Sequence, residues 1–224
     1  MNVTFLRWGA GSLALLVSAA GVTTVLAQDQ PSQSSPAAAT PAPSTEKKDP
    51  SIAQRKENQQ DRIANGIKSG QLTPGETANL EKKEAAINKE TRTDRAANGG
   101  KLTSAEKAQV NQQQNQVSKQ IYADKHNANT AHYGNNKVGQ RRENQQDRIA
   151  QGVKSGQLTP GETAKLEKQQ QGINKQVASD RKANGGTLTA SEKKQVNKEQ
   201  NQASRNIYRK KHNAATQPGA KPKA

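Results

Sequence analysis

The sequence predicts an all-α protein with two tandem homologous three-helix units between disordered tails. Residues 52–127 align without gaps with residues 138–213, and 50 of the 76 positions are identical. Within each unit, apolar residues recur at helical steps of four, seven and eleven, and a Leu-Thr-x-x-Glu motif occurs twice. Antiparallel helices in a bundle, packed like a coiled coil, are the simplest way to bury such narrow apolar stripes.

The first element, residues 1–27, is predicted to be a secretory signal peptide. Arg7 precedes an apolar run from Trp8 to Val22, and small residues lead up to Ala27. A run of this length with a basic start is typical of a cleaved signal and too short for a retained membrane span. We therefore expect cleavage after Ala27 and a bacterial protein that works in the periplasm or outside the cell, without an integral membrane span.

The mature chain is basic and poor in apolar residues. Removing Arg7 from the net charge of +16 leaves +15, and only 23 Ile, Leu, Val and Tyr residues follow Ala27. Such a chain cannot build a large core, so a deep catalytic pocket is not expected, and we predict a non-enzymatic protein without a cofactor. The absence of Cys excludes disulfides and thiolate metal sites. With so few apolar residues, each unit is expected to need self-association or a partner to fold.

Residues 28–51 are rich in Pro, Ser, Ala and Gln, and they are predicted to form a disordered linker. In the first unit, glycines near 66–70 and at 99–100 divide the chain into helices over about 52–67, 74–97 and 104–126. Residues 128–137 then form a linker to the second unit, which repeats the pattern. Residues 214–224 are expected to be a basic disordered tail.

The Leu-Thr-x-x-Glu motif fits a helix-capping box. Thr at the N-cap accepts a hydrogen bond from the third helical amide, and Glu at that position reaches back to the N-cap amide. Pro follows Thr73 and Thr159, at a position where its missing N–H costs nothing. The predicted capping residues are Thr73, Glu76, Thr103, Glu106, Thr159, Glu162, Thr189 and Glu192.

A calcium loop is the alternative reading of the same motif. With Gly70 at loop position 6, Glu76 falls at position 12, as in an EF-hand. Positions 1, 3 and 5 would then be Asn65, Ile67 and Ser69, and Ile67 has no side-chain oxygen. The resemblance to an EF-hand is therefore confined to half of the loop, and a calcium- or metal-responsive protein remains an alternative. The weak candidate metal ligands are Glu76, Glu162, His126 and His212.

Charge is uneven between the units. The first unit has 13 basic and 9 acidic residues, net +4, and the second has 16 and 7, net +9. The second unit ends in RNIYRKKH, whose candidate anion-binding residues are Arg205, Arg209, Lys210 and Lys211. A basic surface of this kind attracts anionic partners such as lipid A, teichoic acid, extracellular DNA or acidic proteins. Sequence-specific nucleic-acid recognition is not expected, because aromatic residues for stacking are scarce.

Carboxylates such as Glu81, beside Lys82 and Lys83, are expected to be solvated ion-pair partners rather than acid–base catalysts.

The segment LTASEKKQVNKEQNQ, from Leu188, resembles the Leu-Thr-x-x-Gln motif and polar helix of periplasmic Spy-like chaperones, although all four motifs here end in Glu. The chain also resembles uncharacterised bacterial secreted proteins built from SGQLTPGE units. The first resemblance implies ATP-independent binding of unfolded proteins on a cationic helical surface. A chaperone-like binding role in the cell envelope is therefore the leading expectation, and polyanion binding is an alternative.

Overall fold

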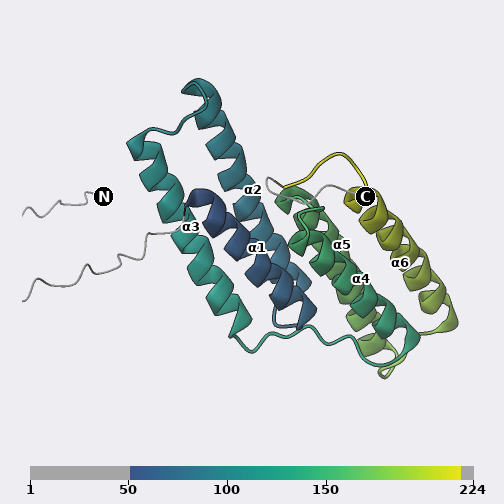
Figure 1. Cartoon of the computed structure of the whole chain (residues 1–224). Helices are drawn as coiled ribbons and strands as arrows, with labels where there is room; N and C mark the ends of the chain where they lie inside the picture. The colour runs from purple at the N-terminus through teal and green to yellow at the C-terminus, as the bar shows by residue number, and fades with distance from the viewer. Residues whose placement is uncertain (1–50, 218–224) are drawn as a thin grey trace, which may run out of the picture. The chain divides into compact units, whose positions relative to one another are not determined.

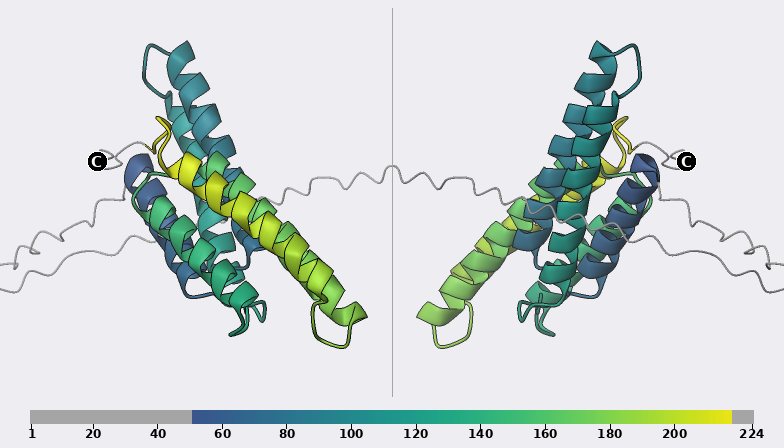
Figure 2. Two further views of the ribbon diagram at one scale, coloured as in Figure 1. Left: turned by 90° about the vertical axis from the view of Figure 1, so that its right-hand side faces the viewer. Right: turned by 90° about the vertical axis from the view of Figure 1, so that its left-hand side faces the viewer.

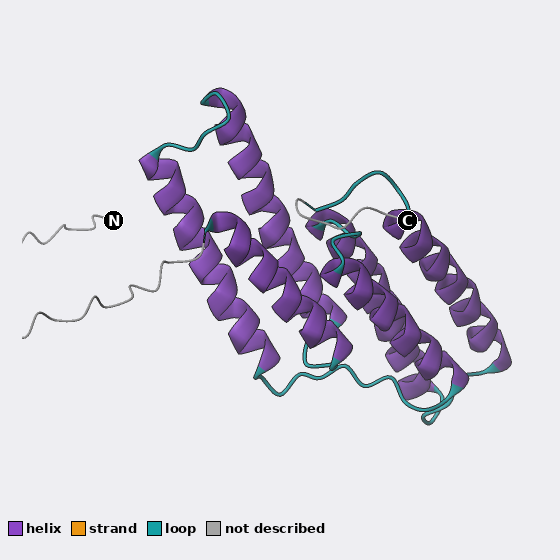
Figure 3. Cartoon of the chain, in the orientation of Figure 1, coloured by secondary structure: helices purple, strands orange, loops and turns teal. Residues whose placement is uncertain are grey.

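The structure is a computed structural model that describes residues 51–217. The predicted signal peptide, almost all of the predicted 28–51 linker and the end of the basic tail lie outside these residues. The described part of the chain is helical without strands (Figure 3), which confirms the all-α prediction. Its helices are α1 (Ile52–Lys68), α2 (Pro74–Ala97), α3 (Ser104–Lys125), α4 (Lys137–Lys154), α5 (Pro160–Ala183) and α6 (Ala190–Lys211).

Side-chain caps define where the helices begin. At the start of α2, α3, α5 and α6, the N-cap Thr and the Glu three residues later form a reciprocal capping box. A further box, formed by Ser51 and Gln54, begins α1, and Asn136 caps α4 through the amide of Gly139. Each cap satisfies amides that a helix start would otherwise leave unpaired.

Glycines end the first helix of each unit. Gly70 and Gly156 both have a φ of +70°, a left-handed conformation that glycine adopts without a side-chain clash. The chain then turns sharply, and the amide of Leu72 donates to the carbonyl of Gly66 at 3.0 Å. Leu158 and Gly152 repeat this bond at 2.9 Å. The turn brings the first two helices of each unit side by side.

The two homologous units pack directly against each other, α2 against α5 and α1 against α4 (Figure 1). The contacts are reciprocal. Gly75 of α2 faces Gln171 of α5. The equivalent residues of the other repeat, Gly161 of α5 and Ala85 of α2, face each other in the same way. This reciprocity is the geometry of a two-fold dimer interface, formed here within a single chain. In the side views, the α2–α3 turn and the α5–α6 turn lie at opposite ends (Figure 2).

One hydrophobic core draws on both units. Leu80 and Ile121 of the first unit lie in the same buried cluster as Leu166 and Ile207 of the second. A smaller cluster, which includes Val177 and Val196, lies between α5 and α6. In the structure each unit packs against the other, so the second copy supplies apolar surface of the kind that a folding partner would supply. Pooling the apolar residues of both units makes one core where neither unit could build a large one.

Buried glutamines tie the helices together where apolar residues are scarce. The amide nitrogen of Gln59 on α1 donates to the carbonyl of Gln114 on α3 at 2.6 Å, and Gln114 donates back to the carbonyl of Ile52 at 2.9 Å. Gln145 and Gln200 make the same exchange between α4 and α6. Since buried polar groups are costly without partners, these bonds let polar residues occupy core positions.

The chain continues against the bundle beyond residue 213, where the sequence places the start of a disordered tail. The amide of Gln217 donates to the carbonyl of Gly156 at 2.9 Å, and its buried side chain donates to the carbonyl of Leu158 at 2.7 Å. Ala131 in the linker bonds equivalently to Gly70, at 2.8 Å. The carbonyls of Gly70 and Gly156 thus each accept a hydrogen bond from the segment that follows their own unit.

Among the helices of residues 51–217, none combines the length and the apolar character that a membrane span requires.

The caps lead to a first testable prediction. Replacing Thr73 with Ala removes the acceptor for the Glu76 amide and is expected to lower the free energy of unfolding by about 1 kcal/mol. Thr93→Ala is the matched control, because Thr93 is an exposed residue inside α2 whose hydroxyl only bonds the carbonyl of Lys89. Urea denaturation of both variants measures the difference. Equal stability of the two variants would contradict the capping role.

Candidate functional site

The carboxylates of Glu76 and Glu162 are surrounded by hydrogen-bond donors. Oε2 of Glu76 accepts from the amide and the hydroxyl of Thr73, at 2.9 and 2.7 Å. Oε1 accepts from the side-chain amides of Asn127 and Asn129, at 2.7 and 3.1 Å. Partial burial by itself raises the pKa of Glu76, but these hydrogen bonds outweigh it and the net effect lowers the pKa.

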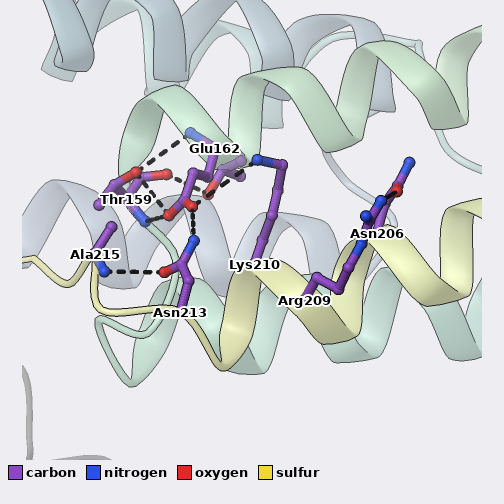
Figure 4. Close-up of polar contacts among 8 residues, drawn as sticks. Thr159, Glu162, Asn206, Arg209, Lys210, Asn213 and Ala215 are labelled. Atoms are coloured by element: carbon purple, nitrogen blue, oxygen red, sulfur yellow. Dashed lines mark hydrogen bonds and ion pairs between the residues drawn. The ribbon is translucent and has the colours of Figure 1, made fainter.

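Glu162 repeats this arrangement at the start of α5 (Figure 4). Thr159 donates to its Oε2 and Asn213 donates to its Oε1 at 2.6 Å. Lys210 of α6 adds a positive charge, with its Nζ 3.9 Å from Oε1. A cation bound at either carboxylate would have to displace these donors. The two Glu residues therefore join each helix start to the end of its own unit, and they do not present a set of metal ligands.

The candidate histidines are held at helix ends. His126 and His212 are the C-caps of α3 and α6, with Nδ1 at 2.7 and 2.8 Å from the carbonyl oxygens of Tyr122 and Tyr208. Each ring stacks on the same tyrosine, with ring centroids 4.1 Å apart. Within residues 51–217, no three His, Asp or Glu side chains come together as a possible metal site.

The four candidate anion-binding residues separate onto different surfaces. Arg205 and Arg209 lie one turn apart on α6 and line a groove of about 560 Å³ together with Arg148 of α4. Lys210 instead points to Glu162 (Figure 4). Lys211 packs beside Gly152, where burial, with the nearby charge of Arg148, lowers its pKa. We call the surface formed by Arg148, Gln202, Ser204, Arg205, Tyr208 and Arg209 the arginine groove.

Each arginine of this groove is positioned by a neutral partner. Arg148 donates to the hydroxyl and carbonyl of Ser204, at 3.1 and 3.3 Å. Arg205 donates to Gln202 at 2.7 Å, and Arg209 donates to Asn206 at 2.5 Å. None of the described residues that line the groove is a carboxylate. The guanidinium charges are therefore held in place without being neutralised by the groove itself.

The first unit has a weaker version of this surface. The positions equivalent to Arg205 and Arg209 are Lys119 and Ala123, and Asp124 replaces Lys210. Only Arg62, the equivalent of Arg148, keeps its role, donating to the carbonyl of Ser118 at 3.0 Å. The concentration of positive charge is thus specific to the second unit.

The interface between the units contains buried carboxyl groups, although the neighbouring lysines predict a solvated Glu81. Glu81 on α2 and Glu167 on α5 are fully buried, and each accepts from a glutamine, Gln60 at 3.1 Å and Gln146 at 3.0 Å. The expectation of a solvated Glu81 is wrong because its neighbours Lys82 and Lys83 point away from the interface in which Glu81 lies. The sequence does carry a signal of this burial. The pair Leu-Glu recurs at the same position of both repeats, as Leu80-Glu81 and Leu166-Glu167.

Burial changes the protonation of these acids. It raises the pKa of Glu81 and of Glu167 to about 8, and the neighbouring carboxyl groups of Glu84 and Glu167 add to the effect on Glu81. Burial also raises the pKa of Glu84 to about 7, although the neighbouring Lys56 opposes the shift. In both Glu81 and Glu167, Oε1 is buried without a hydrogen-bond partner. Protonation removes the charge that would otherwise be stranded there.

Comparison with known protein families, curated proteins and solved structures found no match to this chain.

The buried acids predict a pH-dependent stability. The folded chain keeps the protons of Glu81 and Glu167 up to about pH 8, whereas the unfolded chain releases them above about pH 4.5. Their contribution is fully present below pH 4.5 and is lost as the pH rises through 8, at about 1.4 kcal/mol per unit of pKa difference for each group. The free energy of unfolding is expected to fall between pH 5 and 9.

A Glu81→Gln/Glu167→Gln variant tests this assignment in urea denaturation across that pH range. It should lose most of the pH dependence and exceed the parent chain in stability at pH 9. Glu143→Gln, which removes an exposed carboxylate of α4, is the control and should keep the parent's pH profile. An unchanged profile in the double variant would rule out the two acids as its source.

Proposed function

We propose that this chain is a non-enzymatic, cationic binding protein of the bacterial cell envelope or the extracellular space, and that its ligands are phosphate-bearing polymers. The predicted signal peptide and the net charge support the location and the partner class. The observation that carries the proposal is the arginine groove, where Arg148, Arg205 and Arg209 converge without a carboxylate among the lining residues.

Arginine suits this task better than lysine. Its planar guanidinium donates two parallel hydrogen bonds to a phosphate group and is less strongly hydrated than an ammonium ion. The neutral partners Ser204, Gln202 and Asn206 fix the three side chains before a ligand arrives. Prior fixation reduces the conformational entropy lost on binding.

A chaperone-like role has less support from the surface. Among the described residues, the large exposed hydrophobic side chains are Tyr122 and Tyr208, which are 61% and 59% exposed. Binding of unfolded clients commonly uses contiguous apolar area, and two separate tyrosines supply little of it. The calcium-responsive alternative is disfavoured by the donors around Glu76 and Glu162.

Binding of a fluorescently labelled polyphosphate, followed by anisotropy over a series of salt concentrations, tests the proposal. Arg205→Ala/Arg209→Ala is expected to weaken binding at least about tenfold. It should also reduce the slope of log affinity against log salt concentration by about two, because two ionic contacts are lost. Lys193→Ala/Lys194→Ala removes the same charge from exposed positions near the start of α6 and serves as the control. Equal losses in both variants would show attraction by net charge alone, and no binding by the parent chain would reject the proposal.

A further inference from the structure

The arginine groove also contains an exposed aromatic ring. Tyr208 lines it together with Arg205 and Arg209, and Tyr208 is 59% exposed. Arg205 and Arg209 are exposed as well, so a ligand can reach all three side chains. Binding of phosphate alone requires only hydrogen-bond donors and positive charge. The ring adds a flat apolar face, on which an aromatic group of a ligand can stack.

The ring of Tyr208 is held in place by His212. The two rings stack with their centroids 4.1 Å apart and their planes at 23°. His212 is the C-cap of α6, and its Nδ1 lies 2.8 Å from the carbonyl oxygen of Tyr208. The imidazole thus supports the tyrosine from one side. A ring that is already fixed loses little conformational entropy when a ligand stacks on it.

Positive charges lie on both sides of Tyr208 along α6. Arg205 precedes it by three residues, and Arg209 follows it directly. The four-residue step between the two arginines corresponds to about 6 Å along the helix axis. Neighbouring phosphates of a nucleic-acid strand have a similar separation. Arg148 of α4 adds a third guanidinium, which Ser204 holds one turn before Tyr208.

The row of positive side chains continues beyond the groove. Lys198 is exposed and lies seven residues before Arg205, on the same face of α6. From Lys198 to Arg209 the row extends over about 16 Å of helix. On α4, Arg141 donates to Asn197 and Asn201 at 3.1 and 2.5 Å, so it too is held by neutral partners. A row of this length fits a polymer with several phosphates better than a free nucleotide.

The first unit has the same ring without these charges. Tyr122 is 61% exposed and stacks on His126 with ring centroids 4.1 Å apart. The positions equivalent to Lys198, Arg205 and Arg209 are Gln112, Lys119 and Ala123. The stacked pair alone is therefore a feature of both repeats. The combination of an exposed ring with several arginines belongs to the second unit.

We propose that the arginine groove binds single-stranded nucleic acid independently of its sequence, with one base stacked on Tyr208 and the flanking phosphates bound by Arg148, Arg205 and Arg209. This inference rests on the proposed phosphate-binding function of the groove and names its ligand. Proteins that bind single strands without sequence preference combine a positive groove with an aromatic ring, because every base has a flat face.

The exposed ring distinguishes this ligand from other phosphate polymers. Polyphosphate and sugar–phosphate polymers contain no aromatic group that could stack on Tyr208. In a nucleic-acid duplex the bases stack on one another, so their faces are not available to a side chain. A single strand presents both free bases and closely spaced phosphates.

Two labelled single strands of equal length test the inference by fluorescence anisotropy on the mature chain. One is an oligodeoxythymidylate, and the other is an abasic strand with the same phosphates and no bases. The strand with bases is expected to bind at least about fivefold more tightly. Equal affinity for the two strands would overturn the inference, and the proposed function would still stand if polyphosphate binds. No binding of either strand or of polyphosphate would reject both.

Matched tyrosine variants locate the stacking site. Tyr208→Ala should lower the affinity for the oligodeoxythymidylate to that for the abasic strand, and Tyr208→Phe should retain the difference. Tyr122→Ala removes the equivalent ring, which stacks on His126 in the same way, and should leave both affinities unchanged. Circular dichroism checks that all three variants fold. A preference for bases that survives in Tyr208→Ala, or is lost equally in Tyr122→Ala, would reject Tyr208 as the stacking site.

Discussion

The packing of α2 against α5 is the contact on which the rest of the structure depends. The larger hydrophobic core contains apolar residues of both units, so the helices of one unit complete it for the other, and only a smaller cluster lies within the second unit alone. The two units have similar sequences, repeated at an interval of 86 residues. The same surface of each unit can therefore pack against its own copy in the other unit. The linker only has to keep the two copies together at a high effective concentration.

Buried polar groups within each unit explain how a chain with a mean hydropathy of −1.09 forms a bundle. Glutamines from α1 and α4 bond to the carbonyls of α3 and α6, and protonated Glu81 and Glu167 accept from two further glutamines. Such bonds contribute little net stability, but leaving any of them unmade is costly. They therefore favour one alignment of the helices over alternatives with a similar apolar pattern.

Local features of the sequence predict much of this fold. The helix bounds and the four Thr–Glu capping boxes depend on residues within one turn of each other, and the structure contains them. The packing between units depends on contacts about 86 residues apart, which helical periodicity does not encode. The expectation of a solvated Glu81 is wrong for that reason. Its flanking lysines lie on the exposed side of α2, whereas Glu81 is buried.

The arginine groove also combines residues that the sequence predicts with one that only the fold brings in. Arg205 and Arg209 are four residues apart and share a helix face, as helical geometry requires, whereas Lys210 and Lys211 are rotated onto other faces. Arg148 joins the groove from a different helix, so only the fold brings it there.

Native-state hydrogen exchange of a Leu80→Ala variant tests the shared core most directly. Leu80 is fully buried in the cluster that contains residues of both units, and such a truncation costs about 2–5 kcal/mol. If the two units form one cooperative core, amides in the middle of α4 and α5 should lose as much protection as those in α1 and α2. Full retention of protection in α4 and α5, with loss confined to α1–α3, would show that the two units do not share one cooperative core.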